Sequence, residues 1–382
     1  MKAKSIKGKS PEEIKNVLKQ GMADGFKPTL AFVFISIQQN IEAVIDVLDK
    51  AGIEIFGVTT SGEFVEDEIT DGSIAMMLVD MDPAAFKLCF TQPNDSNFHA
   101  LAKQVGELGQ QLFSNPVFLI GVGRWGHEGE TILRGIEEAV HENVTIFGGV
   151  AGDDLTGNGG MVFTNRIVDT NGLVTLILDG DRINIQGVAA GGWKPIGTVR
   201  RITKSEGNII YTIENEPALE VYQKYLDETI EDIRSRQNTW LLKNFAYFPI
   251  LLERKDELPL VRTGTWTDTE KKSVHFAGPV PEGSLFRFCQ PPDFDVIDTV
   301  ISEANRVLKG GPIPEADALI LFSCVSRRVI FGPLMSGEIR GLKELWNAPL
   351  AGFFSYGEVG RADNGKNELH NTTCCLVALK EK

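Results

Sequence analysis

Three copies of one pattern recur along the chain, and such an internal repeat limits the folds that the chain can adopt. In each copy an apolar strand is followed by a helix, and then by a second apolar strand that ends in a glycine-rich turn. The second strands with their turns cover residues 53–63, 144–154 and 349–358. The first and third turns share the frame Gly-x-x-x-x-Gly-Glu, whereas the middle turn is one residue shorter and ends in Gly152-Asp153.

The repeat predicts an α/β fold. Two parallel strands joined by a helix need a right-handed crossover, and further strands after each copy add antiparallel pairs. These added strands are predicted at residues 73–79, 85–90, 174–178, 183–189 and 373–379. We therefore expect mixed β-sheets with helices outside, built from repeated β-α-β-turn-β units. Two sheets packed face to face in α-β-β-α layers are one arrangement that fits.

The length and charge of the chain disfavour several classes of protein. Its 382 residues predict two or three domains at roughly 100–200 residues each. The net charge of −14 disfavours a nucleic-acid binder, because such binding depends on basic side chains. The longest apolar run, Leu30 to Ile37, is far shorter than the roughly 18 residues of a membrane span, and no apolar segment follows the lysine-rich start. We expect a cytoplasmic protein without membrane insertion.

Cysteine and histidine are too scattered to predict a disulfide framework or a metal site. The five cysteines include no C-x-x-C pair, and the five histidines include no H-E-x-x-H motif. We expect reduced cysteines, most of them in the core, and no metal site built from protein side chains alone.

The segment Gly121-Val122-Gly123-Arg124-Trp125-Gly126 is a literal G-x-G-x-x-G between a predicted strand and a predicted helix. A dinucleotide site needs that context, but it also needs an acidic residue at the end of the next strand, which here ends Phe147-Gly148-Gly149. Two other interpretations stay open: a tight turn without a ligand, and a site in which Arg124 binds a small anion and Trp125 stacks on it.

Polar side chains follow the predicted strands at comparable places in the three copies. Ligands of α/β sheets bind beyond the carboxyl ends of parallel strands, so many of these side chains are expected to line one cleft between the halves of the chain. Arg124 would be the anion clamp, and Trp125 or Tyr356 the apolar wall. The alternative is that the glycines serve chain geometry and the acidic residues cap the next segment. The candidate ligand-binding residues are Thr60, Ser61, Glu63, Arg124, Trp125, Asp153, Ser323, Arg327, Arg328, Ser355, Tyr356 and Glu358.

Catalysis is not expected. Arg327 and Arg328 would lower the pKa of a nucleophilic Cys324, but no histidine is tied to that cysteine by local spacing. The segment Ser355-Tyr356-Gly357 lacks the glycine that a nucleophile elbow needs at Phe353. An enzyme that uses Cys324 or the acidic turns remains the alternative of a different class.

With these residues in view, the chain resembles the FIST family, the F-box and intracellular signal transduction proteins. The first half is similar to the FIST N-terminal domain, which we place at residues 1–226, and the second to the FIST C-terminal domain, at residues 227–382. The resemblance rests on motifs at residues 55–64, 147–154, 192–197, 216–219, 322–324, 352–358 and 370–373, which stand in the family's order.

The resemblance implies a sensory protein that binds a small ligand, with amino acids or similar molecules proposed for the family. It also implies a signalling partner, such as a histidine kinase. No fused output domain is recognised, so the output is expected through a separate partner or a homo-oligomer.

Some family members are haem proteins that sense nitric oxide, and this alternative stays open. The sequence has no c-type attachment motif, so a haem would be held by one axial side chain and an apolar pocket. His370 is the first candidate for that ligand and His127 the second.

Overall fold

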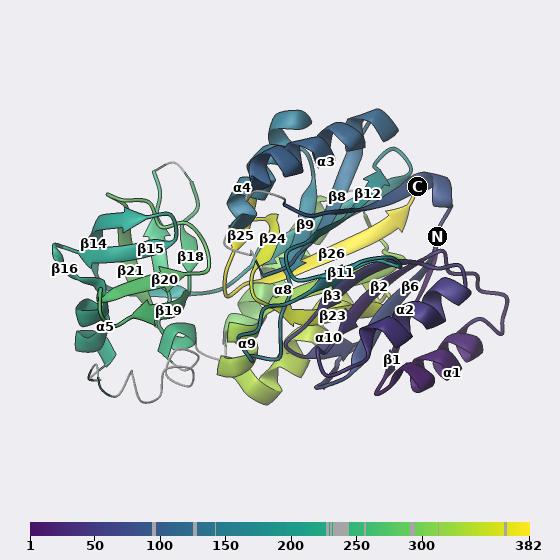
Figure 1. Ribbon diagram of the computed structural model, residues 1–382, viewed down its shortest axis with the longest axis horizontal. Coiled ribbons are helices and arrows are strands. Elements are labelled where there is room, and N and C mark those ends of the chain that lie inside the picture. The colour runs from purple at the N-terminus through teal and green to yellow at the C-terminus, as the bar shows by residue number, and fades with distance from the viewer. Residues whose placement is uncertain are drawn as a thin grey trace.

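Two lobes make up the molecule (Figure 1). The smaller lobe holds residues between 194 and 290, and the larger lobe holds the segments before and after it. Both chain termini lie at the end of the larger lobe that faces away from the smaller lobe, where the Met1 amino group pairs with Glu381. The computed structural model describes residues 1–93, 97–124, 128–141, 143–226, 229, 231, 244–255, 257–290, 295–311, 313–362 and 365–382.

Over these residues the larger lobe has three mixed sheets of six strands each. The first sheet has the order β1 (Lys2–Gly8), β6 (Ile74–Asp80), β2 (Leu30–Ile35), β3 (Glu54–Thr59), β10 (Val162–Phe163) and β11 (Val168–Asp169). The second sheet has the order β7 (Phe86–Thr91), β12 (Leu173–Asp179), β8 (Pro116–Val122), β9 (Ile146–Val150), β24 (Glu358–Arg361) and β25 (Asn367–His370). The third sheet has the order β13 (Ile183–Ala190), β26 (Cys374–Glu381), β22 (Ala318–Cys324), β23 (Leu350–Ser355), β4 (Glu63–Val65) and β5 (Glu68–Thr70).

All three sheets follow one plan, which confirms the predicted α/β class with mixed sheets. At the centre of each lies a parallel pair, β2 with β3, β8 with β9, and β22 with β23. The first strand of each pair has an antiparallel neighbour on its other side, namely β6, β12 or β26. The second strand is bordered by an antiparallel hairpin.

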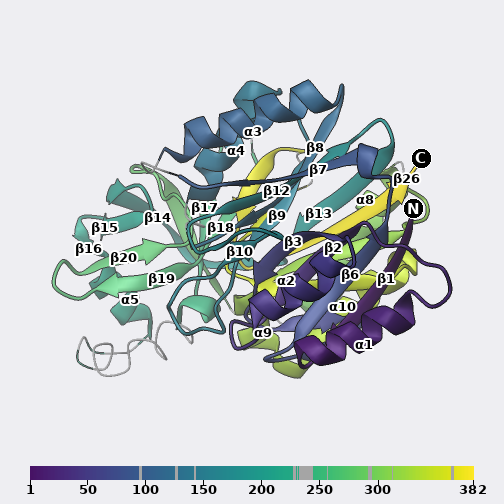
Figure 2. The ribbon, with the colours of Figure 1, turned by 45° about the vertical axis from the view of Figure 1, so that its right-hand side comes forward.

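Helices cover the outer face of each sheet, and Figure 2 shows two of these pairs on opposite sides of the lobe. The helices are α1 (Pro11–Gly21) and α2 (Ile41–Lys50) on the first sheet, α3 (Phe98–Leu112) and α4 (Gly129–Ala139) on the second, and α8 (Asp295–Gly310), α9 (Val325–Phe331) and α10 (Met335–Trp346) on the third. Short 3₁₀ turns lie at η1 (Pro83–Ala85) and η3 (Gly332–Leu334).

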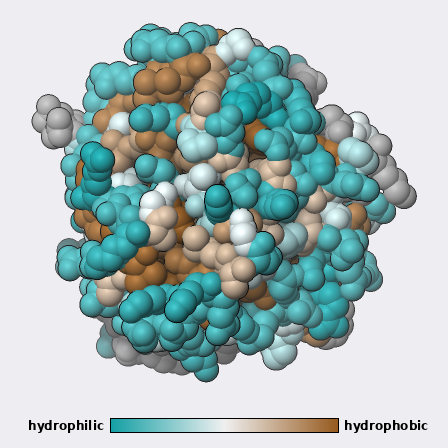
Figure 3. Space-filling view, turned by 90° about the vertical axis from the view of Figure 1, so that its right-hand side faces the viewer, coloured by the Kyte–Doolittle hydropathy of each residue, from teal (hydrophilic) through white to brown (hydrophobic). Residues whose placement is uncertain are grey.

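The inner faces of the sheets share one central core. Strand β2 shows how, because side chains alternate along a strand: Phe32 and Phe34 enter the central core, whereas Ala31, Val33 and Ile35 pack under the helices. Three sheets therefore surround this core, one for each copy, in place of the two sheets of an α-β-β-α stack. The face shown in Figure 3, turned away from the smaller lobe, carries apolar patches among hydrophilic residues.

The hairpin at the border of each sheet follows the glycine-rich turn of another copy, not of the copy that forms the parallel pair of that sheet. The first turn leads into β4 and β5 of the third sheet, the second turn into β10 and β11 of the first sheet, and the third turn into β24 and β25 of the second sheet. Each turn therefore crosses from its own sheet to the next one around the core.

The smaller lobe is built on one further sheet around a core that holds the buried ring of Tyr222. The proposed division at residues 226 and 227 stays a prediction, and it falls inside this lobe. Its strands run β18 (Leu260–Arg262), β17 (Ile250–Glu253), β21 (Leu285–Gln290), β14 (Lys194–Glu206), β15 (Ile209–Ile213), β20 (Ser273–Phe276) and β19 (Gly264–Asp268), with β16 (Glu216–Pro217) beside β15, followed by α5 (Ala218–Leu226).

Among the described residues, none of the helices combines the length and the apolar character that crossing a membrane requires.

Candidate functional site

Backbone hydrogen bonds join the three glycine-rich turns at the centre of the larger lobe. Ser61 N donates to the carbonyl of Phe354 at 3.0 Å, which joins the first turn to the third. Val150 N donates to Gly357 O at 2.9 Å, and Gly152 N donates to Thr59 O at 2.8 Å. The turns that the sequence places far apart therefore meet, and their side chains share one region.

Glu63, the last residue of the first turn, is fully buried and ties that turn to the strand that follows. One carboxyl oxygen accepts the Thr60 hydroxyl, and the other accepts Ser73 N at 3.1 Å and Ser73 Oγ at 2.7 Å. Burial away from water raises the pKa of Glu63 to about 7. The side chain serves the turn and does not line a cavity.

Glu358 occupies the equivalent place in the third turn. Its Oε2 accepts Thr373 N at 3.3 Å and Thr373 Oγ1 at 2.8 Å, while Oε1 lies 2.6 Å from Ser355 Oγ. Ser355 Oγ also lies 3.2 Å from the carbonyl oxygen of Ser323, and a hydroxyl has only one proton to donate. Burial raises the pKa of Glu358 to about 8, which favours the protonated carboxyl group that can supply the second proton.

In the middle turn, the Asp153 carboxylate takes the place of these glutamates and binds Tyr356 of the third turn. It accepts the Tyr356 hydroxyl and also Gly159 N at 2.8 Å and Thr156 Oγ1 at 3.2 Å. The Tyr356 oxygen in turn accepts Leu155 N at 3.0 Å. Desolvation raises the pKa of Tyr356, so its hydroxyl stays neutral and able to donate.

The loop after Asp153, which is hydrogen-bonded to the Tyr356 hydroxyl, has a strained backbone. Asp154 and Leu155 have φ angles of 53° and 62°, in the left-handed region that side chains other than glycine rarely adopt. Such strain persists only where surrounding contacts enforce it, and it is concentrated at functional sites. Here the hydrogen bonds from Tyr356 and Asp153 enforce it.

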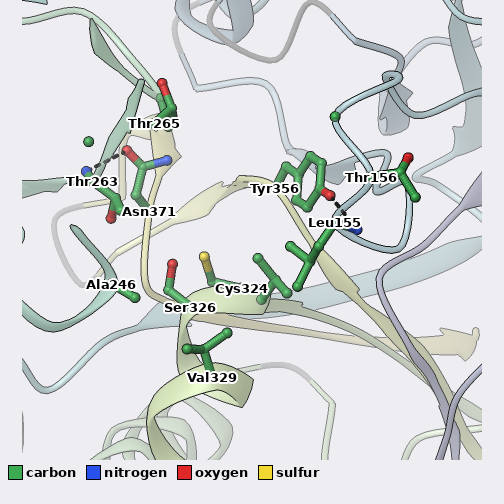
Figure 4. A pocket seen from close by; sticks show the side chains of 14 residues that line it. Leu155, Thr156, Ala246, Thr263, Thr265, Cys324, Ser326, Val329, Tyr356 and Asn371 are labelled. Atoms are coloured by element: carbon green, nitrogen blue, oxygen red, sulfur yellow. Dashed lines mark hydrogen bonds between the residues drawn. The ribbon is translucent and has the colours of Figure 1, made fainter. Parts of the chain in front are cut away.

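A cavity of about 280 Å³ opens beside this loop, between the two lobes. Figure 4 shows the side chains that surround it. The larger lobe contributes the strained loop, the start of α9, Tyr356 and Asn371, and the smaller lobe contributes the segment between β18 and β19. The lining residues are Leu155, Thr156, Gly157, Ala246, Thr263, Gly264, Thr265, Ala277, Cys324, Val325, Ser326, Val329, Tyr356 and Asn371.

Cys324 lines this cavity as a neutral thiol. Desolvation is the largest cause that raises its pKa to about 12, and nearby Glu358 raises it further. A thiol acts as a nucleophile only as the thiolate, which this environment suppresses. The net pKa of Cys324 is therefore raised, whereas the sequence suggested that Arg327 and Arg328 would lower it.

Arg327 and Arg328 bind other residues of the larger lobe, and neither lines the cavity. Arg327 is fully buried, pairs with Glu338, and donates to the carbonyl of Gly191 at 2.8 Å. Arg328 donates to Ser61 O at 2.9 Å and pairs with Asp71 at 2.6 Å. Sequence position alone placed them beside the cavity, but their guanidinium groups are engaged elsewhere.

The buried Arg327 also helps to aim Asn371. Thr372 has a φ of 59°, an outlier for a β-branched residue. Its carbonyl accepts Trp193 Nε1 at 3.0 Å and Arg327 Nη1 at 3.2 Å, which fixes the bend. Asn371, one residue earlier, then lies over the cavity, where its Oδ1 accepts Thr263 N at 3.4 Å from the smaller lobe.

Sequence reasoning missed Asn371 and Thr263 as residues of the site. Asn371 stands in the motif at 370–373, so a signal for it existed. Thr263 and Ala246 belong to the smaller lobe and stand in no recognised motif.

The remaining candidates lie outside the lining of this cavity. Ser61 and Ser323 are buried nearby, and their hydroxyls have no partner among the described atoms. Arg124 is exposed on the surface, with its backbone N bonded to Thr170 O at 2.8 Å. Trp125 and His127 lie outside the described residues.

His370 as a haem ligand stays a prediction. Its imidazole is buried, and its Nε2 has no hydrogen-bond partner in the described part of the chain, as an axial ligand would need. However, His370 does not line the cavity between the lobes, and 280 Å³ lies at the small end of ligand sites, which span about 300–1,000 Å³.

The lobes also meet along a charged surface. Arg262, on β18, pairs with Glu130 of α4 at 3.2 Å and donates to Leu369 O at 2.8 Å. Arg254 pairs with Glu368 of β25. These charged residues line a second, larger hollow of about 880 Å³ between the lobes.

Comparison with known proteins identifies the domains. The FIST N domain matches residues 29–216, and the FIST C domain matches residues 218–361. Uncharacterized proteins of Mycobacterium tuberculosis strains CDC 1551 and H37Rv are each 26% identical to the chain over 244 residues, which is 61% of this chain. The match spans 60% of the length of each relative.

Proposed function

The chain belongs to the FIST family, whose domains are sensory domains of signal transduction, and from this premise we propose that it senses a small ligand in the cavity between its lobes. The observation that carries the proposal is the position of the cavity, since both lobes contribute to its wall. Ligand sites occur preferentially at such boundaries between structural units.

A ligand in this position can change how the lobes are held. It would touch Thr263 and Ala246 of the smaller lobe together with Val329 and Tyr356 of the larger one. A ligand stabilises the arrangement in which its contacts are complete, so binding would favour one placement of the lobes over others. We propose that a separate signalling protein, such as a histidine kinase, or a second copy of the chain reads this change in the cytoplasm.

The proposal includes binding without turnover. Of the lining residues within the described segments, Cys324 is the strongest nucleophile, and its raised pKa leaves it neutral. Catalysis by a thiol also needs a base within hydrogen-bond reach, and Ser326 beside it is not a base.

Filling the cavity tests the proposal. In Val329→Phe the larger side chain would occupy the space beside Cys324, whereas Val199→Phe makes the same change at a side chain that is 45% exposed on the smaller lobe. A thermal-shift screen of amino acids and other small molecules is run on the native chain and both variants. A ligand of this cavity raises the melting temperature of the native chain and of Val199→Phe, but not of Val329→Phe.

Two results would argue against the proposal. Equal stabilisation of Val329→Phe would place the ligand elsewhere. Consumption of the bound compound, followed by NMR, would show an enzyme in place of a sensor.

A further inference from the structure

The cavity between the lobes offers no counterion to a charged ligand. Over the segments that the structure describes, its lining side chains are apolar, hydroxyl, thiol or amide groups. Arg327, a buried cation on the helix α9 that contributes to the wall, is already bound to Glu338 and to two backbone carbonyls. An ion that enters such a space loses its hydration without gaining a partner of opposite charge.

The carboxylate behind the cavity wall strengthens this discrimination. Asp153 repels an anion next to Tyr356, and it does not itself line the cavity. Its two oxygens already accept hydrogen bonds from Tyr356, Gly159 and Thr156.

Asn371 supplies a directed hydrogen-bond donor. Its amide nitrogen carries two protons, and one of them is donated to His370 O at 2.9 Å. Figure 4 shows this nitrogen turned toward Tyr356, on the cavity side of the amide, while the amide oxygen faces Thr263. The second proton is therefore placed to meet an acceptor on a ligand.

The opposite part of the wall is apolar. Val329 and Ala246 lie below Asn371 in Figure 4, and Leu155 lies beside the Tyr356 ring. Val325 also lines the cavity. An apolar skeleton placed there would be removed from water while its polar end faces Asn371.

We propose that this cavity takes an uncharged molecule that presents a carbonyl or hydroxyl oxygen to Asn371 on an apolar skeleton. An apolar cavity of about 150 Å³ holds benzene, so about 280 Å³ holds roughly a dozen non-hydrogen atoms. The inference rests on the proposed function, because it names the class of ligand for the same cavity.

Two sets of probes with matched skeletons test this class. The first set is N-acetyl-leucinamide, N-acetyl-leucine, leucinamide and leucine, which are neutral, anionic, cationic and zwitterionic at about pH 6. The second set is benzamide, benzoate and benzylamine. We expect the neutral member of each set to bind about tenfold tighter than its ions in calorimetric titration, a difference of about 1.4 kcal/mol. An ion that binds as tightly as its neutral partner, or more tightly, would overturn the proposal.

Replacing the donor tests the role of Asn371. Asn371→Leu keeps the size of the side chain and removes the donor, so the affinity for benzamide should fall about tenfold while that for ethylbenzene is unchanged. Asn184→Leu, on the edge strand β13 of the larger lobe, is the matched control. If Asn371→Leu does not fold, Ser326→Ala takes its place, because Ser326 is also a polar residue of the lining. For Ser326→Ala we expect a smaller loss of benzamide affinity. Unchanged benzamide affinity in the folded variant would contradict the inference.

Val329→Phe separates this inference from the proposed function. If ions bind and Val329→Phe abolishes their binding, the cavity is the sensory site and only the class of ligand is wrong. If no probe binds in a way that Val329→Phe prevents, the proposed function fails, and this inference fails with it.

Discussion

Folding changes the pKa of two residues, Glu63 and Glu358. In both turns a buried carboxyl group bonds to a hydroxyl three residues earlier and to a Ser or Thr at the start of a later strand. The folded chain holds these protons more tightly than the unfolded chain does, because burial raises both pKa values. Their contribution to stability is therefore full in acid and lost as the pH rises through the folded pKa.

Glu358→Gln tests this pH dependence. The pKa of Glu358 rises from an ordinary 4.5 to about 8 on folding, so the native chain should lose stability between about pH 5 and pH 8, by up to about 1.4 kcal/mol per pH unit. Glutamine cannot titrate and retains donors and acceptors, so this slope should flatten in the variant. Urea unfolding at several pH values measures it, with the exposed Glu344→Gln as the control that keeps the native slope. The same slope in Glu358→Gln would show that Glu358 is ionised in the folded state.

Arg327 and Arg328 are neighbours with unequal roles. Arg327→Met should lower the free energy of unfolding by about 3–5 kcal/mol, because it leaves Glu338 as a buried and unpaired charge. Arg328→Met should change it by about 1 kcal/mol or less, because its partner Asp71 is 72% exposed. Chemical denaturation compares the two variants. Equal losses would contradict the structural role assigned to Arg327.

The sequence predicted which residue types gather at the turns better than it predicted the contacts that their side chains make. The shared Gly-x-x-x-x-Gly-Glu frame placed Glu63 and Glu358 in equivalent positions, and the structure gives them equivalent partners. It could not show that Arg327 faces Glu338, because that partner lies on another helix and only the folded chain brings the two together.

At the level of elements, glycine is required where neighbouring strands and the hairpin of another copy pack closely together. A Cβ atom on Gly352 would collide with the backbone carbonyl of Leu321 and with the Phe64 ring, whereas one on Gly337 would meet nothing within 4 Å. Position 352 lies at the crossing, and position 337 is exposed on α10.

Paired alanine substitutions test this packing. Gly352→Ala should lower the free energy of unfolding by about 3 kcal/mol or more, because a backbone carbonyl cannot move away. Gly337→Ala should raise it by about 0.5–1 kcal/mol, because alanine favours the helix. Thermal unfolding of both variants gives the comparison, and a Gly352→Ala variant as stable as the native chain would mean that the turns are not packed as described.

The loop over the cavity depends on one hydroxyl. Tyr356→Phe keeps the ring and removes the group that donates to Asp153 and accepts from Leu155 N. Amide hydrogen exchange in residues 154–159 should become faster, with a loss of about 1–3 kcal/mol in stability. Tyr211→Phe, on β15, should leave that exchange unchanged. Unaltered protection in Tyr356→Phe would show that the strained loop is held by other contacts.

The elements themselves were predictable because their signals are local. Apolar strands, capped helices and the glycine turns can each be recognised within a few residues; Ser10, for example, caps α1 by accepting Glu13 N. The exchange of hairpins between sheets has no local signal, because the short β4, β10 and β24 pair with strands of a different copy. For that reason the sequence suggested two packed sheets where the larger lobe forms three.

On the scale of the whole molecule, the cavity exists because the smaller lobe lies over the meeting point of the turns. The sequence predicted a cleft between halves of the chain, and Tyr356 does line a cavity between lobes. The lobe that completes it carries no repeat and no recognised motif at Thr263 or Ala246, so its part of the wall could not be assigned from sequence. The ion pairs of Arg262 and Arg254 fix that lobe against α4 and β25.

Fluorine NMR of the chain labelled with 3-fluorotyrosine tests the central claim, a ligand site between the lobes, most directly. The chain has five tyrosines, and the resonance of Tyr356 is assigned by its loss in Tyr356→Phe. On titration with a ligand that stabilises the protein, the Tyr356 resonance should shift and saturate at the affinity measured by calorimetry, while that of Tyr211 stays in place. Saturable binding that leaves the Tyr356 resonance unmoved would contradict the account.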